Sequence, residues 1–314
     1  MERITELLPL PARPVDGHKG TFGTVAVVAG CAGRTRMIGA AVFVATAATR
    51  TGAGLVRVVA PEPICNSILT GAPHATALAV PVGADGDMLE QEAIATVDEA
   101  LSACRALVIG PGMGRGGSGG IVGRLVLRAV GQEEAPVIVD ADGLNALAAT
   151  VDYPREMRGR VILTPHPGEF GRLAKAVGVK PDPASPEERV EAAGDLARRL
   201  GCIVVLKGAG TVISDGHRVR VCQRGHPCLA TGGTGDVLAG VIGGLVAQFG
   251  PPAFMPGGAT GLDLFMLACL GVEAHAMAGE AWARQTGASA GLLAGELCGF
   301  IPAVIETLRP GECG

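Results

Sequence analysis

One segment of the chain places a glycine-rich loop and an acidic residue at the predicted start of a helix. It reads Thr231-Gly232-Gly233-Thr234-Gly235-Asp236, and apolar residues spaced three and four apart follow it, which predicts a helix over 236–249 with one buried face. The first N–H groups of a helix lack partners within it, and glycines let an anion approach them. Asp236 would repel a resident phosphate, but it could take a proton from a hydroxyl group beside one. A phosphate cradle next to a general base indicates phosphoryl transfer to an alcohol.

The same residues also fit a purely structural interpretation, because threonine or aspartate at a helix start is ordinary capping and glycines there can simply mark a turn. The remaining loops favour the functional interpretation. Polar or glycine-rich loops follow five predicted strands, at 30–34, 110–114, 140–145, 164–169 and 207–211. Ligands of open parallel sheets bind outside the carboxyl ends of the strands. Five such loops on one rim indicate a cleft rather than five independent turns.

These loops require an alternation of strands and helices to position them. Strands are predicted at 24–29, 55–60, 106–110, 136–140, 161–164, 202–206 and 211–214, and helices at 38–51, 119–131, 186–200, 236–249 and 264–286, with a second helix after the last. Several strands are continuous Val, Ile and Leu runs, as expected when both faces are covered. The pattern predicts an α/β fold with a doubly wound, mostly parallel sheet and helices on both faces. No linker or repeat divides the chain, so residues 1–314 are expected to form a single domain.

Composition argues against several classes of protein. The chain of 314 residues is 48% hydrophobic but only 3% aromatic, and its net charge is −4, with Lys and Arg scattered. Nucleic-acid binding is therefore not expected. Nine cysteines without a CxxC pair, mostly in apolar runs, indicate a reducing cytoplasm. The N-terminus has no apolar signal core and the longest apolar run, 264–272, is too short to cross a bilayer, so no membrane partner is expected.

Single polar residues on the predicted rim each have two interpretations. Lys207 directly follows an apolar strand and could hold a phosphate, or it could reach solvent. His166, between two prolines, could contact a ligand or be structural. Glu169 could cap the next helix, or act through water on a magnesium–phosphate complex. Asp140 and Asp142 could contact a ribose, a metal-bound water or only their own backbone.

A second glycine pattern points elsewhere. Residues 112–117 match G-x-G-x-x-G after a strand, and Asp140 follows near the distance expected for a ribose-binding acid, which taken alone suggests a dinucleotide-binding oxidoreductase. Five glycines within 110–117 match many patterns by chance, however, and this hypothesis gives the 232–236 loop no function. No G-x4-G-K-[ST] motif is present, which excludes a Walker-type NTPase.

Taken together, the motifs resemble the ADP/ATP-dependent NAD(P)H-hydrate dehydratases, ribokinase-like proteins that repair hydrated nicotinamide cofactors. The resemblance is carried, in order along the chain, by residues 18–23, 39–41, 51–56, 110–114, 140–145, 164–169 and 230–240. It runs from about Lys19 to the C-terminus and leaves residues 1–18 as a lead-in. The family often carries a fused N-terminal epimerase domain, so we expect a separate epimerase to supply the correct epimer.

The resemblance implies a specific reaction. Asp236 would deprotonate the C6 hydroxyl of the S-epimer of hydrated NADH or NADPH while that hydroxyl attacks the terminal phosphate of ADP or ATP, with Mg²⁺ as cofactor. Phosphate would then be expelled and NADH or NADPH re-formed. Ala40, Gly114, His166 and Asp236 would face the hydrated dinucleotide. The adenine nucleotide and its phosphates would be held by Lys207, Gly208, Ala209, Gly210, Thr211, Gly232, Gly233, Thr234 and Gly235.

Two other functions stay open at this point. One is an ATP-dependent kinase of the hydroxyethylthiazole or hydroxymethylpyrimidine type, and the other is a non-catalytic nucleotide-binding module. The related kinases carry Asn where His166 stands, which favours the dehydratase. Sequence does not separate ADP from ATP or hydrated NADH from hydrated NADPH, and it assigns neither Arg34 nor Arg36 to a 2′-phosphate. Apolar helix faces and family precedent predict a homo-oligomer, and residues 251–262 are expected to form an insertion of open function.

Overall fold

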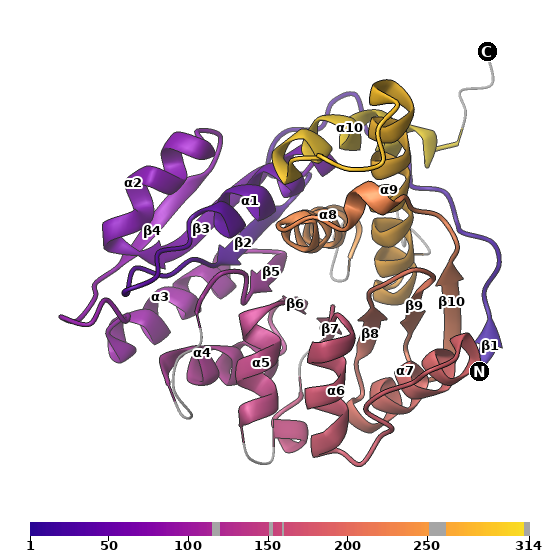
Figure 1. The fold of residues 1–314 in the computed structure, drawn as a ribbon. Coiled ribbons are helices and arrows are strands. Elements are labelled where there is room, and N and C mark those ends of the chain that lie inside the picture. The colour runs from indigo at the N-terminus through magenta and orange to yellow at the C-terminus, as the bar shows by residue number, and fades with distance from the viewer. Residues whose placement is uncertain (115–119, 151–152, 159, 251–261, 311–314) are drawn as a thin grey trace.

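A single sheet of ten strands organises the described part of the chain (Figure 1). The computed structural model describes residues 1–114, 120–150, 153–158, 160–250 and 262–310. The strand order is β1-β10-β9-β8-β7-β6-β5-β2-β3-β4, and seven neighbouring strands from β8 to β4 run parallel. Only β9 runs antiparallel to its two neighbours. A parallel core needs crossover helices, which the alternating sequence supplies.

The strands are short and largely buried. They are β1 (Glu2–Arg3), β2 (Thr24–Val28), β3 (Leu55–Pro61), β4 (Thr76–Val80), β5 (Ala106–Ile109), β6 (Val137–Val139), β7 (Val161–Leu163), β8 (Ile203–Leu206), β9 (Thr211–Ser214) and β10 (Arg218–Cys222). Every residue of β5, β6, β7 and β8 is buried, in agreement with their continuous apolar sequences. The chain reverses its strand order between β2 and β5, and this switch point opens a crevice at the carboxyl ends of the strands.

Helices cover both faces of the sheet and build two apolar cores. One core lies under α1 (Gly39–Thr51), α2 (Glu62–Gly71), α8 (Thr234–Phe249), α9 (Leu264–Thr286) and α10 (Ala294–Thr307). The other lies under α3 (Glu90–Ala103), α4 (Ile121–Val130), α5 (Asp142–Ala149), α6 (Pro167–Ala176) and α7 (Pro186–Leu200). Figure 1 shows α8 lying across the middle of the sheet beside α1 and α9.

Glycines let α8 approach its neighbours closely. A Cβ at Gly240 would lie 2.5 Å from the carbonyl oxygen of Val44 on α1, and one at Gly243 would lie 2.7 Å from Val108 on β5. Any larger side chain at these positions would push α8 off both surfaces. Since the Gly232–Asp236 segment leads into α8 and forms its first turn, this packing fixes the segment near β5 and β6.

Most predicted elements are confirmed. All seven predicted strands are present within one or two residues, and the helices at 38–51, 186–200, 236–249 and 264–286 occur with small shifts at their starts. The helix predicted at 119–131 is seen as α4, and residue 119 lies outside the described residues. Strand β4 was missed because its sequence, Thr-Ala-Leu-Ala-Val, has a weak strand preference and is only partly buried. Of the expected insertion at 251–262, residues 251–261 also lie outside the described residues, and Leu262 is buried.

One long apolar helix, α9, has the bounds predicted for it, 264–286. The apolar run at 264–272 belongs to a 23-residue helix, which by length and composition alone could cross a membrane. Within the protein, 72% of its most apolar window is buried. A buried core helix passes the same test of length and composition, and this helix contacts α8 and α10.

Candidate active site

Helix α8 begins in a loop that leaves backbone N–H groups free. Its N-cap, Gly233, lies at φ 94°, a left-handed conformation that suits a residue without a Cβ, and no side chain caps the helix. The Thr234 hydroxyl instead donates to two carbonyl oxygens of the preceding loop, at 2.8 and 2.9 Å. The N–H groups of Gly232, Gly233 and Gly235 have no hydrogen-bond partner in the part of the chain that the structure describes. The start of α8 therefore presents several donors and the positive end of the helix dipole to an anion.

Asp236 lies on the first turn of this helix and is partly buried. Its carboxylate makes no hydrogen bond with any described residue. Burial and the nearby carboxylate of Asp140 raise the pKa of Asp236 from its ordinary value of 3.8 to about 7; Lys207 opposes this shift and Asp142 adds to it. A carboxyl group with a pKa near 7 is well matched to general-base catalysis at neutral pH.

A buried charge network lies directly behind the helix start. Oδ1 of Asp140, which is 1% exposed, accepts hydrogen bonds from the Thr164 hydroxyl at 2.8 Å and from Lys207 Nζ at 2.7 Å. Its second oxygen, Oδ2, is buried without a partner among the described residues. Lys207 Nζ also lies 4.0 Å from the buried Glu169 carboxylate. Burial alone would lower the pKa of Lys207, but Asp140 and Glu169 raise it above its ordinary value, so the side chain is cationic.

The structure brings Lys207 to the glycine-rich loop. A Cβ at Gly235 would lie 3.4 Å from Lys207 Nζ and 3.9 Å from Asp140 Oδ2, which are contact distances, so the helix start lies directly against the charged pair. Two predicted sets, the strand-end lysine and the 232–236 loop, therefore form one surface. A phosphate held by the loop would lie beside the Lys207 ammonium group.

The other members of the predicted nucleotide set, residues 208–211, form the turn from β8 into β9. Gly208 and Gly210 adopt φ 143° and 67°, and the Thr211 hydroxyl donates to the Gly208 carbonyl oxygen at 2.9 Å. Arg189 of α7, which the sequence did not single out, donates to the carbonyl oxygens of residues 206 and 207 at 3.3 Å. Arg189 thus braces the turn that follows Lys207.

His166 serves as the cap of α6. Its Nδ1 accepts hydrogen bonds from the N–H groups of Gly168 and Glu169, at 3.0 and 3.4 Å, so the ring proton lies on Nε2. Glu169 completes a capping box by accepting from the His166 N–H at 2.8 Å, and its other oxygen lies 3.3 Å from His166 Nε2. Burial raises the pKa of Glu169 to about 7, although Lys207 opposes this shift. The His166 side chain remains 53% exposed, which leaves one edge of the ring free to meet a ligand.

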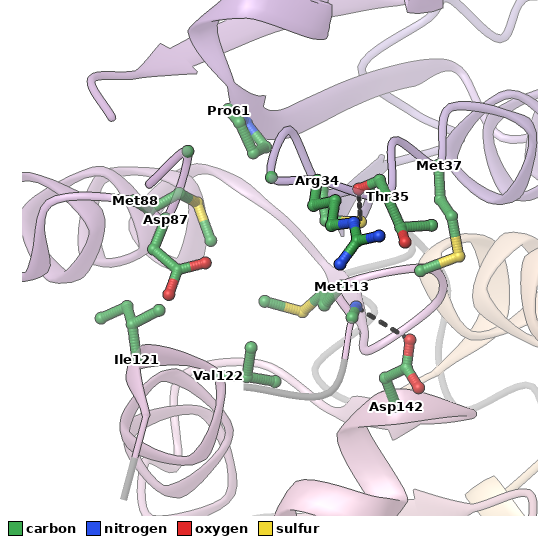
Figure 2. Close-up of a pocket in the computed structure, with 15 residues that line it drawn as sticks. Arg34, Thr35, Met37, Pro61, Asp87, Met88, Met113, Ile121, Val122 and Asp142 are labelled. Atoms are coloured by element: carbon green, nitrogen blue, oxygen red, sulfur yellow. Dashed lines mark hydrogen bonds between the residues drawn. The ribbon is translucent and has the colours of Figure 1, made fainter. Parts of the chain in front are cut away.

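The loops predicted to face the dinucleotide meet beside this network. The N–H of Gly114 donates to Asp142 Oδ2 at 2.9 Å, and a Cβ at Gly112 would lie 3.0 Å from the Cβ of Ala40. Gly114 and Asp142 also line a cavity of about 590 Å³ at the carboxyl ends of β2, β3, β5 and β6 (Figure 2). Ala141, between Asp140 and Asp142, is the one non-glycine residue with positive φ in the described chain, at 50°. Backbone strain of this kind is common where a loop must aim functional side chains.

A histidine of α9 supports the glycine-rich loop from behind. His275 Nε2 lies 2.9 Å from the carbonyl oxygen of Thr234, and burial lowers the pKa of His275 to about 4, so the neutral ring donates this hydrogen bond. Sequence reasoning did not select this residue. The available signal was a single histidine within a predicted apolar helix, a pattern that more often marks a buried structural residue than a ligand.

Comparison with known proteins identifies the family. The model of the NAD(P)H-hydrate dehydratase family matches residues 25–302. The chain belongs to this family. It is 35% identical over 290 residues to an ADP-dependent (S)-NAD(P)H-hydrate dehydratase of Neisseria meningitidis, covering 91% of this chain and 86% of that one. It is 36% identical over 302 residues to a bifunctional NAD(P)H-hydrate repair enzyme of Moorella thermoacetica, covering 96% of this chain and 52% of that one, and so spans about half the length of the bifunctional relatives.

Solved structures of the NAD(P)H-hydrate dehydratase family and its superfamily have the same fold. A Bacillus subtilis ADP/ATP-dependent NAD(P)H-hydrate dehydratase, co-crystallised with ATP/Mg²⁺, matches with a TM-score of 0.73 and 31% identity, covering 96% of this chain and 95% of that one. A ribokinase-like superfamily protein of Enterococcus faecalis matches with a TM-score of 0.73 at 21% identity, covering 98% of this chain and 96% of that one. The predicted ribokinase-like, doubly wound fold and the predicted family are therefore both confirmed.

Proposed function

We propose that this protein is an ADP- or ATP-dependent dehydratase that converts the S-epimer of hydrated NADH or NADPH back to the reduced cofactor. The observation that carries the proposal is the position of Asp236. Its carboxyl group has a pKa of about 7 and no hydrogen-bond partner among the described residues, and it lies on the first turn of the helix whose preceding glycine N–H groups can hold a phosphate. The family assignment and the relatives named as dehydratases support the same activity.

The proposed reaction has two stages. Asp236 accepts the proton of the C6 hydroxyl as that oxygen forms a bond to the terminal phosphorus of the nucleotide, and the bond from this phosphorus to the bridging oxygen breaks. ADP then leaves as AMP, or ATP as ADP. Electrons of the ring nitrogen next expel inorganic phosphate from C6, and loss of a proton from C5 restores the double bond. Phosphorylation is needed because hydroxide is a far poorer leaving group than phosphate.

The protein groups contribute mainly charge and position. The N–H groups of Gly232, Gly233 and Gly235 would stabilise the negative charge that develops on the transferring phosphoryl group, and Lys207 would add a cation beside them. A general base contributes about 10²–10⁴-fold to such a transfer. His166 and Ala40 would border the ring that carries the hydroxyl.

Magnesium enters this proposal through the nucleotide. Among the described residues, no group of three or more His, Cys, Asp or Glu side chains is arranged to hold a metal ion, and the Lys207 ammonium already lies between Asp140 and Glu169. These side chains alone do not fit a free Mg²⁺. Mg²⁺ usually keeps several waters and binds nucleotide phosphates, so we propose that it arrives as a complex with ADP or ATP, with Glu169 acting at most through water.

The proposed substrate is a single epimer, so an activity that supplies this epimer is needed. We propose that an epimerase activity supplies the S-epimer, because several relatives are named bifunctional NAD(P)H-hydrate repair enzymes. A homo-oligomer remains a proposal that sedimentation would test.

One assay tests the function directly. The protein is mixed with hydrated NADH, Mg²⁺ and either ADP or ATP, and recovery of the NADH absorbance band is followed together with release of phosphate and of AMP from ADP or ADP from ATP. Recovery that requires the nucleotide supports the proposal. Stable phosphorylated substrate without NADH would instead indicate a small-molecule kinase, and no reaction with either nucleotide would refute catalysis of this repair.

A further inference from the structure

The cavity of about 590 Å³ beside the site contains a cation that no described residue neutralises. Arg34 lies in the loop after β2 and lines the cavity, and its exposed guanidinium makes no hydrogen bond or ion pair with the described part of the chain. Figure 2 shows the Arg34 side chain directed into the cavity toward Met113, with Asp142 on the far side. The next arginine, Arg36, is equally exposed but does not line the cavity.

Residues that line the cavity adjoin the proposed active site. Asp142 lines it and also contributes to the raised pKa of Asp236, which places its charge within electrostatic reach of the base. Gly114, another lining residue, donates to Asp142 at 2.9 Å. A Cβ at Gly112 would lie 3.3 Å from the Cβ of Met37 in the cavity wall and 3.0 Å from the Cβ of Ala40 at the site. A substrate whose reacting carbon meets Asp236 can therefore extend into this cavity.

The lining of the cavity has the chemistry of a nucleotide site. Three methionines, with Ile121 and Val122, offer apolar and polarizable side chains that adapt to a flat heterocycle. Asp87 and Asp142 can accept hydrogen bonds from ribose hydroxyls, but they would repel a phosphate. A phosphate in this cavity would therefore bind at Arg34, which presents several N–H donors to its oxygens.

We propose that the cavity receives the part of the hydrated dinucleotide remote from the reacting ring, and that Arg34 binds one of its phosphates. This inference rests on the proposed function and assigns a specificity-determining residue to it. Two phosphate groups share this chemistry, the pyrophosphate of every dinucleotide and the 2′-phosphate of hydrated NADPH. Arg34 contributes to affinity for either phosphate group, because its guanidinium can bind a phosphate without first breaking an ion pair with a described residue.

Kinetics of matched variants test the assignment. Arg34→Ala should raise the KM for hydrated dinucleotides about 5- to 30-fold with little change in kcat, because a charge-assisted contact remote from the reaction is lost. Arg36→Ala, two residues away and outside the cavity, should match the wild type. Hydrated dihydronicotinamide riboside, which has no phosphate, should show the same KM with both variants. If the KM of Arg34→Ala rises only for hydrated NADPH, Arg34 binds the 2′-phosphate. If the KM rises equally for hydrated NADH and hydrated NADPH, Arg34 binds the pyrophosphate.

A binding measurement separates this inference from the function itself. Calorimetry with NADPH and NADH should show weaker binding to Arg34→Ala than to Arg36→Ala or the wild type, and this comparison requires no turnover. If the wild-type protein binds NADPH and NADH but recovers neither from its hydrate, the proposed function fails, while the binding comparison still tests whether Arg34 contacts a phosphate. The assignment of Arg34 would be overturned if all three proteins bound NADPH and NADH equally well. It would also be overturned if Arg34→Ala raised the KM for the phosphate-free riboside as much as for the dinucleotides.

Discussion

Replacing Asp236 with asparagine should separate catalysis from nucleotide binding. The amide keeps the size of the side chain but cannot accept the substrate proton, so kcat should fall by about 10²–10⁴-fold. Affinity for ADP should stay within about threefold of the wild type, because the Gly232–Gly235 donors and Lys207 are unchanged. Removal of a negative charge beside the phosphates can only favour the nucleotide.

The same substitution should stabilise the protein at alkaline pH. The rise in the pKa of Asp236 from 3.8 to about 7 means that the fold disfavours its ionised form. At about 1.4 kcal/mol per unit, the shift sets an upper limit of about 4 kcal/mol. Because Asp236 is partly exposed to solvent, we expect about 1–3 kcal/mol. In the wild type, ionised Asp236 lowers the free energy of unfolding by the full amount above pH 7. This destabilisation decreases as pH falls toward 4, and it is absent below the pKa of the unfolded state.

Thermal unfolding at pH 5 and pH 8, with steady-state kinetics, measures both effects. The Asp236→Asn variant should unfold about 2–6 °C higher than the wild type at pH 8 and nearer to it at pH 5. The exposed Asp182 provides a matched control, since Asp182→Asn should change neither turnover nor the pH dependence of unfolding. Retained turnover in the Asp236→Asn variant would refute the general base. A stability difference independent of pH would refute the electrostatic argument.

Three further outcomes follow from the same geometry. Gly233→Ala should lower the free energy of unfolding by about 1–3 kcal/mol in chemical denaturation, because φ at Gly233 is 94° and the new Cβ would lie 2.8 Å from neighbouring side chains. Gly232→Ala is the control: no atom lies within 4 Å of its Cβ, so this variant should unfold like the wild type. Lys207→Met removes the cation that lowers the pKa of Asp236, so the acidic limb of the pH–rate profile should move to higher pH; an unmoved limb would contradict the assigned network. His166→Ala should lose about 1 kcal/mol of stability through the missing α6 cap, and His166→Asn should recover most of it, as measured by urea unfolding.

The sequence predicted the fold well where strands are apolar and continuous. Strands β5 to β8 are short Val, Ile and Leu runs that both cores cover, and their carboxyl ends were located correctly within two residues. The edge was harder to predict. Strand β4 contains two alanines, and β1 has only two residues, so neither carries a periodic signal that exceeds its surroundings. Pairing between β1 and β10 joins residues more than 200 positions apart, which no local pattern can indicate.

The predicted site was incomplete in its long-range contacts. Sequence placed Lys207, Asp140 and Asp236 at strand and helix ends, but not the 2.7 Å ion pair between the first two or its effect on the third. For His166 the sequence allows either a ligand-binding or a structural role, and its local contacts are those of a helix cap, with part of the ring still exposed. His275 acts through a hydrogen bond to the backbone 41 residues away, and this contact depends entirely on the packing of α9 against α8.

The charges of the site explain why the helix start must supply its donors through the backbone. Asp236 can act only when ionised, yet Asp140 and Asp142 already raise its pKa, and an arriving nucleotide adds more negative charge beside it. Lys207 alone cannot offset this, because its ammonium is bonded to Asp140 at 2.7 Å. In the proposed reaction, the N–H groups of Gly232, Gly233 and Gly235 would offset phosphate charge without introducing a side chain that would pair with Asp236. The glycine loop would therefore do two things at once in this reaction: it would hold the phosphate, and it would keep the neighbouring carboxylate able to take a proton near neutral pH.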